Sequence, residues 1–363
     1  MSSLGPNTTT APGLPARIRT LDLAMLGMMF FLMCFGLGYP TLNRYDPGKI
    51  AGTVDAGEYY AVMVRGHAEP PLDTDHRILI PYLARPVLHL AQGRIGTWDA
   101  GWFALLVVNS AFLAGTATLI LLVGRLHLGD GTTALLGALL FLLNHIVANL
   151  ELAGLVDAGE VFFLMAVVWC LTKDRWWLLP IVGVPGATVK ETFVPLAAAV
   201  AAGWWIAAWD QPGRFRRAAW VLALVLAGFG AVTLVMSAQH GRLHLASQFA
   251  ADVAAAPTGP GWMVALLHSV ANHLFVLTFA WLLPLGVWKL RLLPVGWQWG
   301  AAAGFAAALA MGAYNDAGNN TVRALFNVVG PILSLSAAAM LAGWFSATRL
   351  ASFRLGPRRE PEP

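Results

Sequence analysis

The chain has 363 residues, of which 58% are hydrophobic and only 12% are charged, with a formal net charge of +4. Soluble globular domains carry about 25% charged residues, so this composition excludes an ordinary soluble domain and indicates a polytopic membrane protein. The positive charges alternate with apolar runs and form no basic block, which argues against a nucleic-acid partner. Cys34 and Cys170 both lie inside apolar runs, so we expect neither a disulfide framework nor a cysteine metal site.

The apolar runs predict an all-α transmembrane bundle of about ten spans, because a helix needs about 20 apolar residues to cross a bilayer. We expect a disordered cytoplasmic tail over residues 1–20, a single transmembrane domain over 21–345 and a basic cytoplasmic tail over 346–363. The predicted spans are 21–39, 102–123, 134–148, 161–172, 176–189, 193–209, 218–237, 264–287, 297–314 and 326–345.

The distribution of charge predicts the orientation of these spans. Positively charged loops mark the cytoplasmic side of bacterial-type membrane proteins. With the N-terminus inside, every inside segment of the ten-span topology is basic, and most acidic residues fall at outside edges. The expected topology therefore has both termini in the cytoplasm. Most acidic side chains, which are the candidates for catalysis or binding, lie on the extracytoplasmic face. A composition rich in Ala, Leu, Trp and Arg favours a bacterial inner membrane.

The first outside loop, residues 40–101, is far longer than an ordinary connection, and such loops are usually functional or disordered. Within it, residues 56–64 can form a short helix with apolar side chains to bury. Residues 78–91 form an apolar stretch that contains two prolines and has two arginines within or beside it. This pattern predicts an interfacial helix lying on the bilayer and not a span.

The pentapeptide Val-Asp-Ala-Gly-Glu occurs twice and contributes Asp55 with Glu58 and Asp157 with Glu160. Residues three apart share a helical face, so each copy places two carboxylates together. Acids near hydrocarbon are costly, which makes them functional candidates. The structural alternative is a capping box, with Asp at the N-cap and Glu at N3. We favour function for Asp55, which is followed by Tyr59 in the long loop, and leave both interpretations open for Asp157.

Three cations on the predicted outer face oppose the charge bias: Arg77, Lys190 and Arg323. Arginine and lysine both bind phosphate, so the functional interpretation is an anion site, such as one for the phosphate of a lipid carrier. The structural alternative is that Lys190 pairs with Glu191 or another outer carboxylate, and that Arg323 pairs with Asp316.

The order of these features resembles the C-type (GT-C) glycosyltransferase superfamily, polytopic membrane enzymes that use sugars carried on polyprenyl phosphates. The resemblance covers the spans from 21 to 345. It depends on an early acid in the first outer loop, an Arg-apolar-Pro segment, a second acid at the start of a span, a Lys-Glu-Thr break, and an arginine before a last span that contains proline. Those motifs are residues 55–60, residues 77–81, Asp157, residues 190–192, Arg323 and Pro331. Many members have adjacent acids or an acid-x-acid motif where this chain has Asp-x-x-Glu.

The resemblance implies transfer of a sugar from a polyprenyl-phosphate carrier to a hydroxyl of a glycan, lipid or protein acceptor, among membrane lipids. Asp55 would be the general base, with Glu58 as the second catalytic carboxylate. Metal-using members hold a divalent cation such as Mg or Mn, for which Asp55 and Asp157 would be the ligands here. The implied substrate-binding residues are Tyr59, Arg77, Asp157, Lys190, Glu191 and Arg323.

Two other functions remain open. A transporter or lipid flippase places polar groups near the bilayer midplane and interrupts helices there. The predicted spans instead carry their ionisable residues at the outer ends, which favours surface chemistry. The third interpretation is a non-catalytic membrane scaffold with a degenerate transferase fold.

Overall fold

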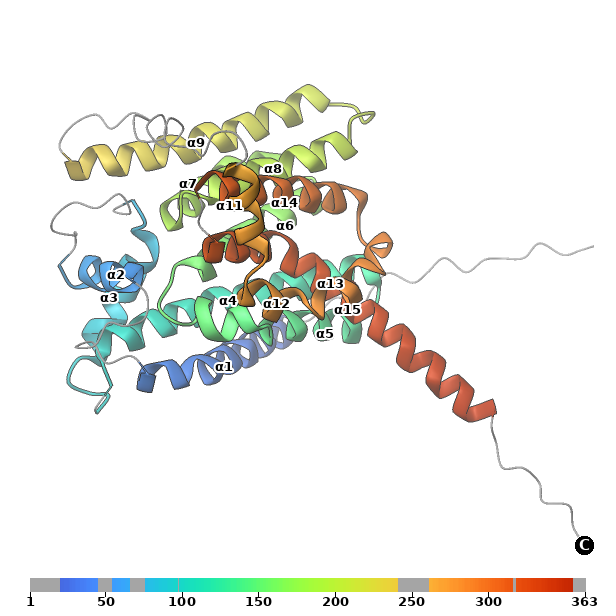
Figure 1. The fold of residues 1–363 in the computed structure, drawn as a ribbon, viewed down its shortest axis with the longest axis horizontal. Helices are drawn as coiled ribbons and strands as arrows, with labels where there is room; N and C mark the ends of the chain where they lie inside the picture. Colours follow the sequence, from blue (N-terminus) through green and yellow to red (C-terminus); the bar gives the residue numbers. More distant parts are fainter. Residues whose placement is uncertain are drawn as a thin grey trace, which may run out of the picture.

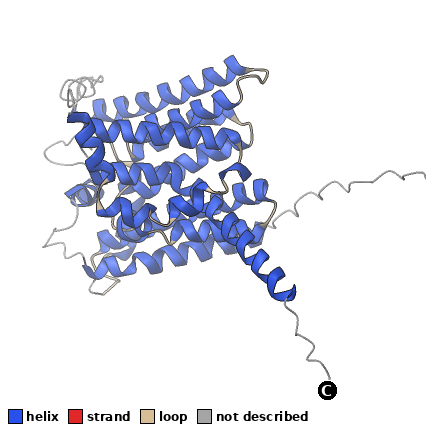
Figure 2. Cartoon of the chain, turned by 45° about the vertical axis from the view of Figure 1, so that its right-hand side comes forward, coloured by secondary structure: helices blue, strands red, loops and turns tan. Residues whose placement is uncertain are grey.

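A computed structural model describes residues 20–44, 54–65, 76–96, 98–240, 261–315 and 318–354. The regular structure of these residues is entirely helical, which confirms the all-α fold class (Figure 2). The elements are α1 Thr20–Arg44, α2 Val54–Arg65, α3 Leu79–Ala91, α4 Ala100–Leu128, α5 Gly131–Leu142, the π-helix η1 Val147–Glu151, α6 Asp157–Thr172, the 3₁₀ turn η2 Trp176–Leu178, α7 Leu179–Val189, α8 Phe193–Ala207, α9 Arg214–His240, α11 Gly261–Val270, α12 His273–Phe279, α13 Leu282–Val287, the 3₁₀ turn η3 Leu290–Leu292, α14 Val295–Asn315 and α15 Gly318–Arg354.

In the part of the chain that the structure describes, four helices are long and apolar enough to cross a membrane, namely α1, α4, α9 and α15. A fifth candidate is the pair α11 and α12, which meet at an angle of 54°. These helices indicate a membrane protein. The other predicted spans correspond to shorter or less apolar helices, so the count of ten stays a prediction.

Two predicted spans are not continuous helices. The span predicted over 134–148 is interrupted, because α5 ends at Leu142 and a π-helix follows. The side chain of Asn144 accepts a hydrogen bond from the backbone nitrogen of Ile146 in this break. The span predicted over 264–287 is divided into α11, α12 and α13, and Asn272 caps α12 by accepting from the nitrogen of Phe275. Asn144 also donates to the carbonyl of Thr278, which ties the two broken segments together.

The two short helices predicted in the first long loop are present as α2 and α3. Helix α3 buries Ile80, Ala84 and Leu88 on one side, and it packs against α4. In Figure 1, α2 and α3 lie at the left end of the bundle, and the C-terminal part of α15 leaves at the right. The fold therefore has one end built from short helices and helix breaks.

Helices α8 and α14 approach each other at backbone distance. A Cβ atom on Gly203 of α8 would lie 2.7 Å from the backbone nitrogen of Gly300 and closer still to the carbonyl of Trp299. A Cβ atom on Gly300 would lie 2.8 Å from the carbonyl oxygen of Val200. Small residues at helix interfaces permit such approaches in membrane proteins.

We expect Gly203→Ala to destabilise the protein by about 1–3 kcal/mol, because the added methyl meets backbone that cannot move aside. The measurement is thermal unfolding of the purified protein in detergent. The matched control is Gly230→Ala in α9, where a Cβ atom meets nothing within 4 Å. Equal melting temperatures for the two variants would contradict the close approach.

Candidate functional site

A buried ion-pair network centres on Lys190. Its Nζ lies 2.8 Å from Oδ1 of Asp157 and 3.4 Å from Oε2 of Glu160. All three side chains are almost completely buried. Charges taken out of water need partners, and each of these groups has one. The Asp-x-x-Glu spacing on α6 presents both carboxylates to a single ammonium group.

The network extends to α15 and to the start of α8. Nη1 of Arg323 lies 3.4 Å from Oδ2 of Asp157, and Nδ2 of Asn327 donates to Oε2 of Glu160 at 2.7 Å. The hydroxyl of Thr192 donates to Oε1 of Glu160. Three separate helical elements are thus joined through the two acids of α6.

Lys190 and the two acids of α6 lie at or next to breaks between helices. Lys190 has an extended backbone between α7 and α8, where its side chain leaves the helical path and reaches α6. Asp157 is the first residue of α6, but neither it nor Val156 makes a side-chain capping bond. The capping-box interpretation of Asp157 and Glu160 is therefore wrong, because both carboxylates are used by Lys190 and its neighbours.

A second cluster surrounds Glu191. Nε and Nη2 of Arg77 donate to its two carboxylate oxygens at 2.8 and 2.5 Å, and Nε2 of His76 lies 2.8 Å from Oε2. Nη1 of Arg77 donates to the hydroxyl of Tyr59 on α2 at 2.7 Å. The bidentate geometry fixes the orientation of Arg77 and connects α2 to the α7–α8 break.

The charge of Glu191 depends on Arg77. Burial opposes that charge, but the guanidinium of Arg77 and the hydrogen bonds with His76 and Arg77 outweigh burial and hold the pKa of Glu191 well below its usual range. The Glu191 side chain keeps 40% of its surface exposed, so water reaches this pair more readily than the Lys190 network.

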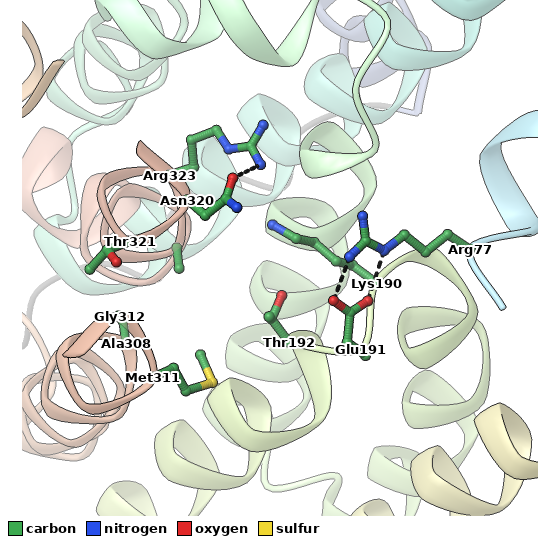
Figure 3. A pocket seen from close by; sticks show the side chains of 11 residues that line it. Arg77, Lys190, Glu191, Thr192, Ala308, Met311, Gly312, Asn320, Thr321 and Arg323 are labelled. Carbon is green, nitrogen blue, oxygen red and sulfur yellow. Dashed lines mark hydrogen bonds and ion pairs between the residues drawn. The ribbon is translucent and has the colours of Figure 1, made fainter. Parts of the chain in front are cut away.

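The two clusters meet at one cavity of about 100 Å³. A single water needs about 10–15 Å³ on this measure, so the space admits several waters or a small oxyanion. Figure 3 shows Lys190 between Arg323 on one side and Arg77 on the other. The lining residues are Arg77, Lys190, Glu191, Thr192, Ala308, Met311, Gly312, Asn320, Thr321, Arg323 and Ala324.

The structure thus brings together most of the candidate residues from the sequence. Arg77, Lys190, Glu191 and Arg323 line the cavity, Tyr59 contacts Arg77, and Asp157 lies behind Lys190. Lys190 pairs with the acids of α6 and not with Glu191. The backbone of residues 55 and 58 lies in α2, but the side chains of Asp55 and Glu58 lie outside the described part of the chain, as does Asp316.

A divalent cation does not fit at Asp157. Its two oxygens each lie within 3.4 Å of a positively charged nitrogen, which would repel a metal ion. Among the described residues, no group of three or more His, Cys, Asp or Glu side chains is arranged to hold a metal. The Asp55 half of the predicted metal site involves a side chain outside the described residues.

Sequence reasoning missed Asn327 and Glu151. Asn327 follows Arg323 by four residues on α15, so the helical spacing was a usable signal. Glu151 interrupts an apolar stretch between α5 and α6 and is fully buried. A lone acid in such a stretch is itself a signal of function in a membrane protein.

Comparisons with protein-family models, curated protein sequences and solved structures find no match to this chain. The function is therefore inferred from the site itself.

We expect Lys190→Met to cost about 3–5 kcal/mol of stability, because it leaves two buried carboxylates without their common cation. Thermal unfolding in detergent measures this loss. Lys289→Met, a matched change outside the network, should leave the melting temperature nearly unchanged. A small effect of Lys190→Met would mean that the acids are neutral or paired elsewhere.

The Arg77–Glu191 pair predicts a specific acid sensitivity. Because folding lowers the pKa of Glu191, its contribution to stability is present above the unfolded pKa of about 4.3 and is lost as pH falls toward the lower folded pKa. The stability difference between the native chain and Glu191→Gln should shrink as pH falls below about 4.3. Unfolding measured as a function of pH checks this, and a difference that shrinks near neutral pH would contradict it.

Proposed function

We propose that the cavity binds the phosphate of an anionic lipid and that the protein transfers a sugar from a polyprenyl-phosphate carrier to an acceptor hydroxyl. The observation that carries the proposal is the convergence of Arg77, Lys190 and Arg323 on one cavity. Its lining carries three positive side chains and one negative one, Glu191, because Asp157 and Glu160 are not part of the lining.

Unused hydrogen-bonding capacity supports an anion at this position. Nε of Arg323 is buried and has no hydrogen-bond partner among the described residues. Leaving a buried donor of a charged group unsatisfied is costly. A phosphate oxygen in the cavity would accept from such a donor, and the neighbouring Asn320 and Thr192 supply further polar groups.

The seam between α14 and α15 supports a lipid over a small soluble anion. The same two helices line a second cavity of about 160 Å³, bounded on α14 by Ala301 and Phe305 and on α15 by Val329 and Leu333. Phe305 precedes Ala308 of the first cavity by three residues, which is about 4.5 Å along a helix. Among the described residues, Gln298 is the only polar one in its lining. A cavity lined by three cationic side chains beside an apolar one suits an amphiphile with an anionic head.

The chemistry expected at such a site is a single displacement. The acceptor hydroxyl attacks the anomeric carbon of the sugar, the bond from that carbon to the phosphate oxygen breaks, and Asp55 takes the hydroxyl proton. Residue 55 precedes Tyr59 by one turn of α2, and Tyr59 contacts Arg77 at the cavity. The cations stabilise the departing lipid phosphate.

A transporter is the second candidate, and the buried charges favour it. Lys190, Asp157 and Glu160 are buried and lie at helix breaks, as substrate and ion sites of secondary transporters do. Passage would require the cavity to open toward the opposite end of the bundle as well.

We expect Asp55→Asn to lower sugar transfer by about 100-fold or more, because general-base catalysis contributes at least that much. Purified protein is given a panel of polyprenyl-phosphate sugars, with and without divalent metal, and release of free polyprenyl phosphate is followed. The control is Asp210→Asn at an exposed site.

Full activity of Asp55→Asn would show that Asp55 is not the general base. If the native chain releases nothing from any donor yet binds polyprenyl phosphate, transport or a scaffold function replaces transfer.

A further inference from the structure

Glu151 is a buried acid that the ion-pair network does not use. It ends the π-helical turn η1 and has no exposed surface. Neither of its carboxylate oxygens has a hydrogen-bond partner among the described residues. A carboxylate in this position would be an isolated buried charge, which costs far more than a buried neutral acid.

The charged groups around Glu151 determine whether its carboxyl group is protonated. The charged groups that act on it are Asp157 and Glu160 of α6, Arg323 of α15 and Lys190. Two acids and two cations already balance, so an ionised Glu151 would add an uncompensated negative charge.

Among the described side chains, the elements packed against η1 supply nothing further to balance it. Helix α1 contributes the buried thiol of Cys34, which interacts electrostatically with Glu151, and α5 has no titratable side chain. The side chain of Arg44, at the end of α1, lies outside the described part of the chain. Short π-helical turns are frequent at functional sites, which adds to the case that the position is not merely structural.

We propose that Glu151 is a proton-binding site, neutral in the resting protein, and that its proton is linked to anion binding at the cavity. The linkage rests on the proposed anion site. An anion near Lys190 and Arg323 makes ionisation of Glu151 still less favourable. By reciprocity, loss of the proton weakens anion binding.

Infrared spectroscopy of the full chain tests the proton directly. The native chain at pH 7 should show the carbonyl stretch of a buried neutral carboxylic acid, and Glu151→Gln should lack it. Glu191→Gln is the matched control and should keep the band, because Glu191 is ionised by Arg77. An unchanged spectrum for Glu151→Gln, or no acid band in the native chain, overturns the proton site.

A bound monovalent cation is the alternative way to neutralise this carboxylate. If sodium raises the melting temperature of the native chain but not of Glu151→Gln, and the acid band is absent, the site holds the cation and the proton proposal fails.

The linkage is tested with inorganic sulfate as probe, because its charge stays constant across the pH range used. Sulfate affinity is measured below and above the pH at which the acid band of the native chain disappears. Across that pH the affinity of the native chain should fall by about tenfold more than that of Glu151→Gln, which mimics the neutral acid throughout. Parallel affinities for the two proteins across the loss of the band overturn the linkage.

The variant Asn320→Asp distinguishes a failure of the linkage from a failure of the anion site. It adds a negative charge to the cavity lining without touching η1, so it should weaken sulfate binding at every pH. If the native chain binds no sulfate, the proposals of an anion site and of its linkage to Glu151 are both wrong. The infrared result still decides whether Glu151 carries a proton.

Discussion

The ammonium group of Lys190 is the contact on which this end of the bundle depends. It lies where α7 stops and α8 begins, and it bridges the two acids in the first turn of α6. Without that cation, Arg323 alone would face two buried carboxylates in a region from which water is excluded. In the break between α7 and α8 Lys190 has an extended backbone, and from there its side chain reaches the acids of α6.

The second cluster extends this arrangement toward solvent. Glu191 directly follows Lys190 in the chain but pairs with Arg77 and His76. The two adjacent residues of this break therefore belong to different ion-pair clusters at the cavity. Arg77 in turn holds Tyr59 of α2. The short helices α2 and α3 are thereby fixed to the bundle by polar contacts at the same place where the cations gather.

Hydropathy and charge alternation in the sequence identify most of this site but not its pairing. They place Arg77, Asp157, Lys190 and Arg323 on one side of the protein, because each interrupts an apolar pattern. Which acid pairs with which cation depends on tertiary packing between α6, the α7–α8 break and α15, and no spacing encodes it. The capping box is wrong for this reason, since the carboxylate of Asp157 binds distant cations and not the nearby backbone.

The helices show the same difference between what the sequence predicts and what it does not. Long apolar runs predicted α1, α4, α9 and α15 well, while the spans over 134–148 and 264–287 are interrupted. The interruptions arise at Asn144 and Asn272, whose side chains bond to nearby backbone. Asparagine competes with the helical ladder in this way, and hydropathy averaged over a window does not register it.

The backbone contact between α8 and α14 has a mechanical consequence. Gly203 and Gly300 bring the backbones of these two helices into direct contact, with no room for a side chain between them. Both helices contribute to the cavity lining, through Thr192 just before α8 and Met311 on α14. A residue larger than glycine at either position would push α8 and α14 apart, and with them these two parts of the cavity lining.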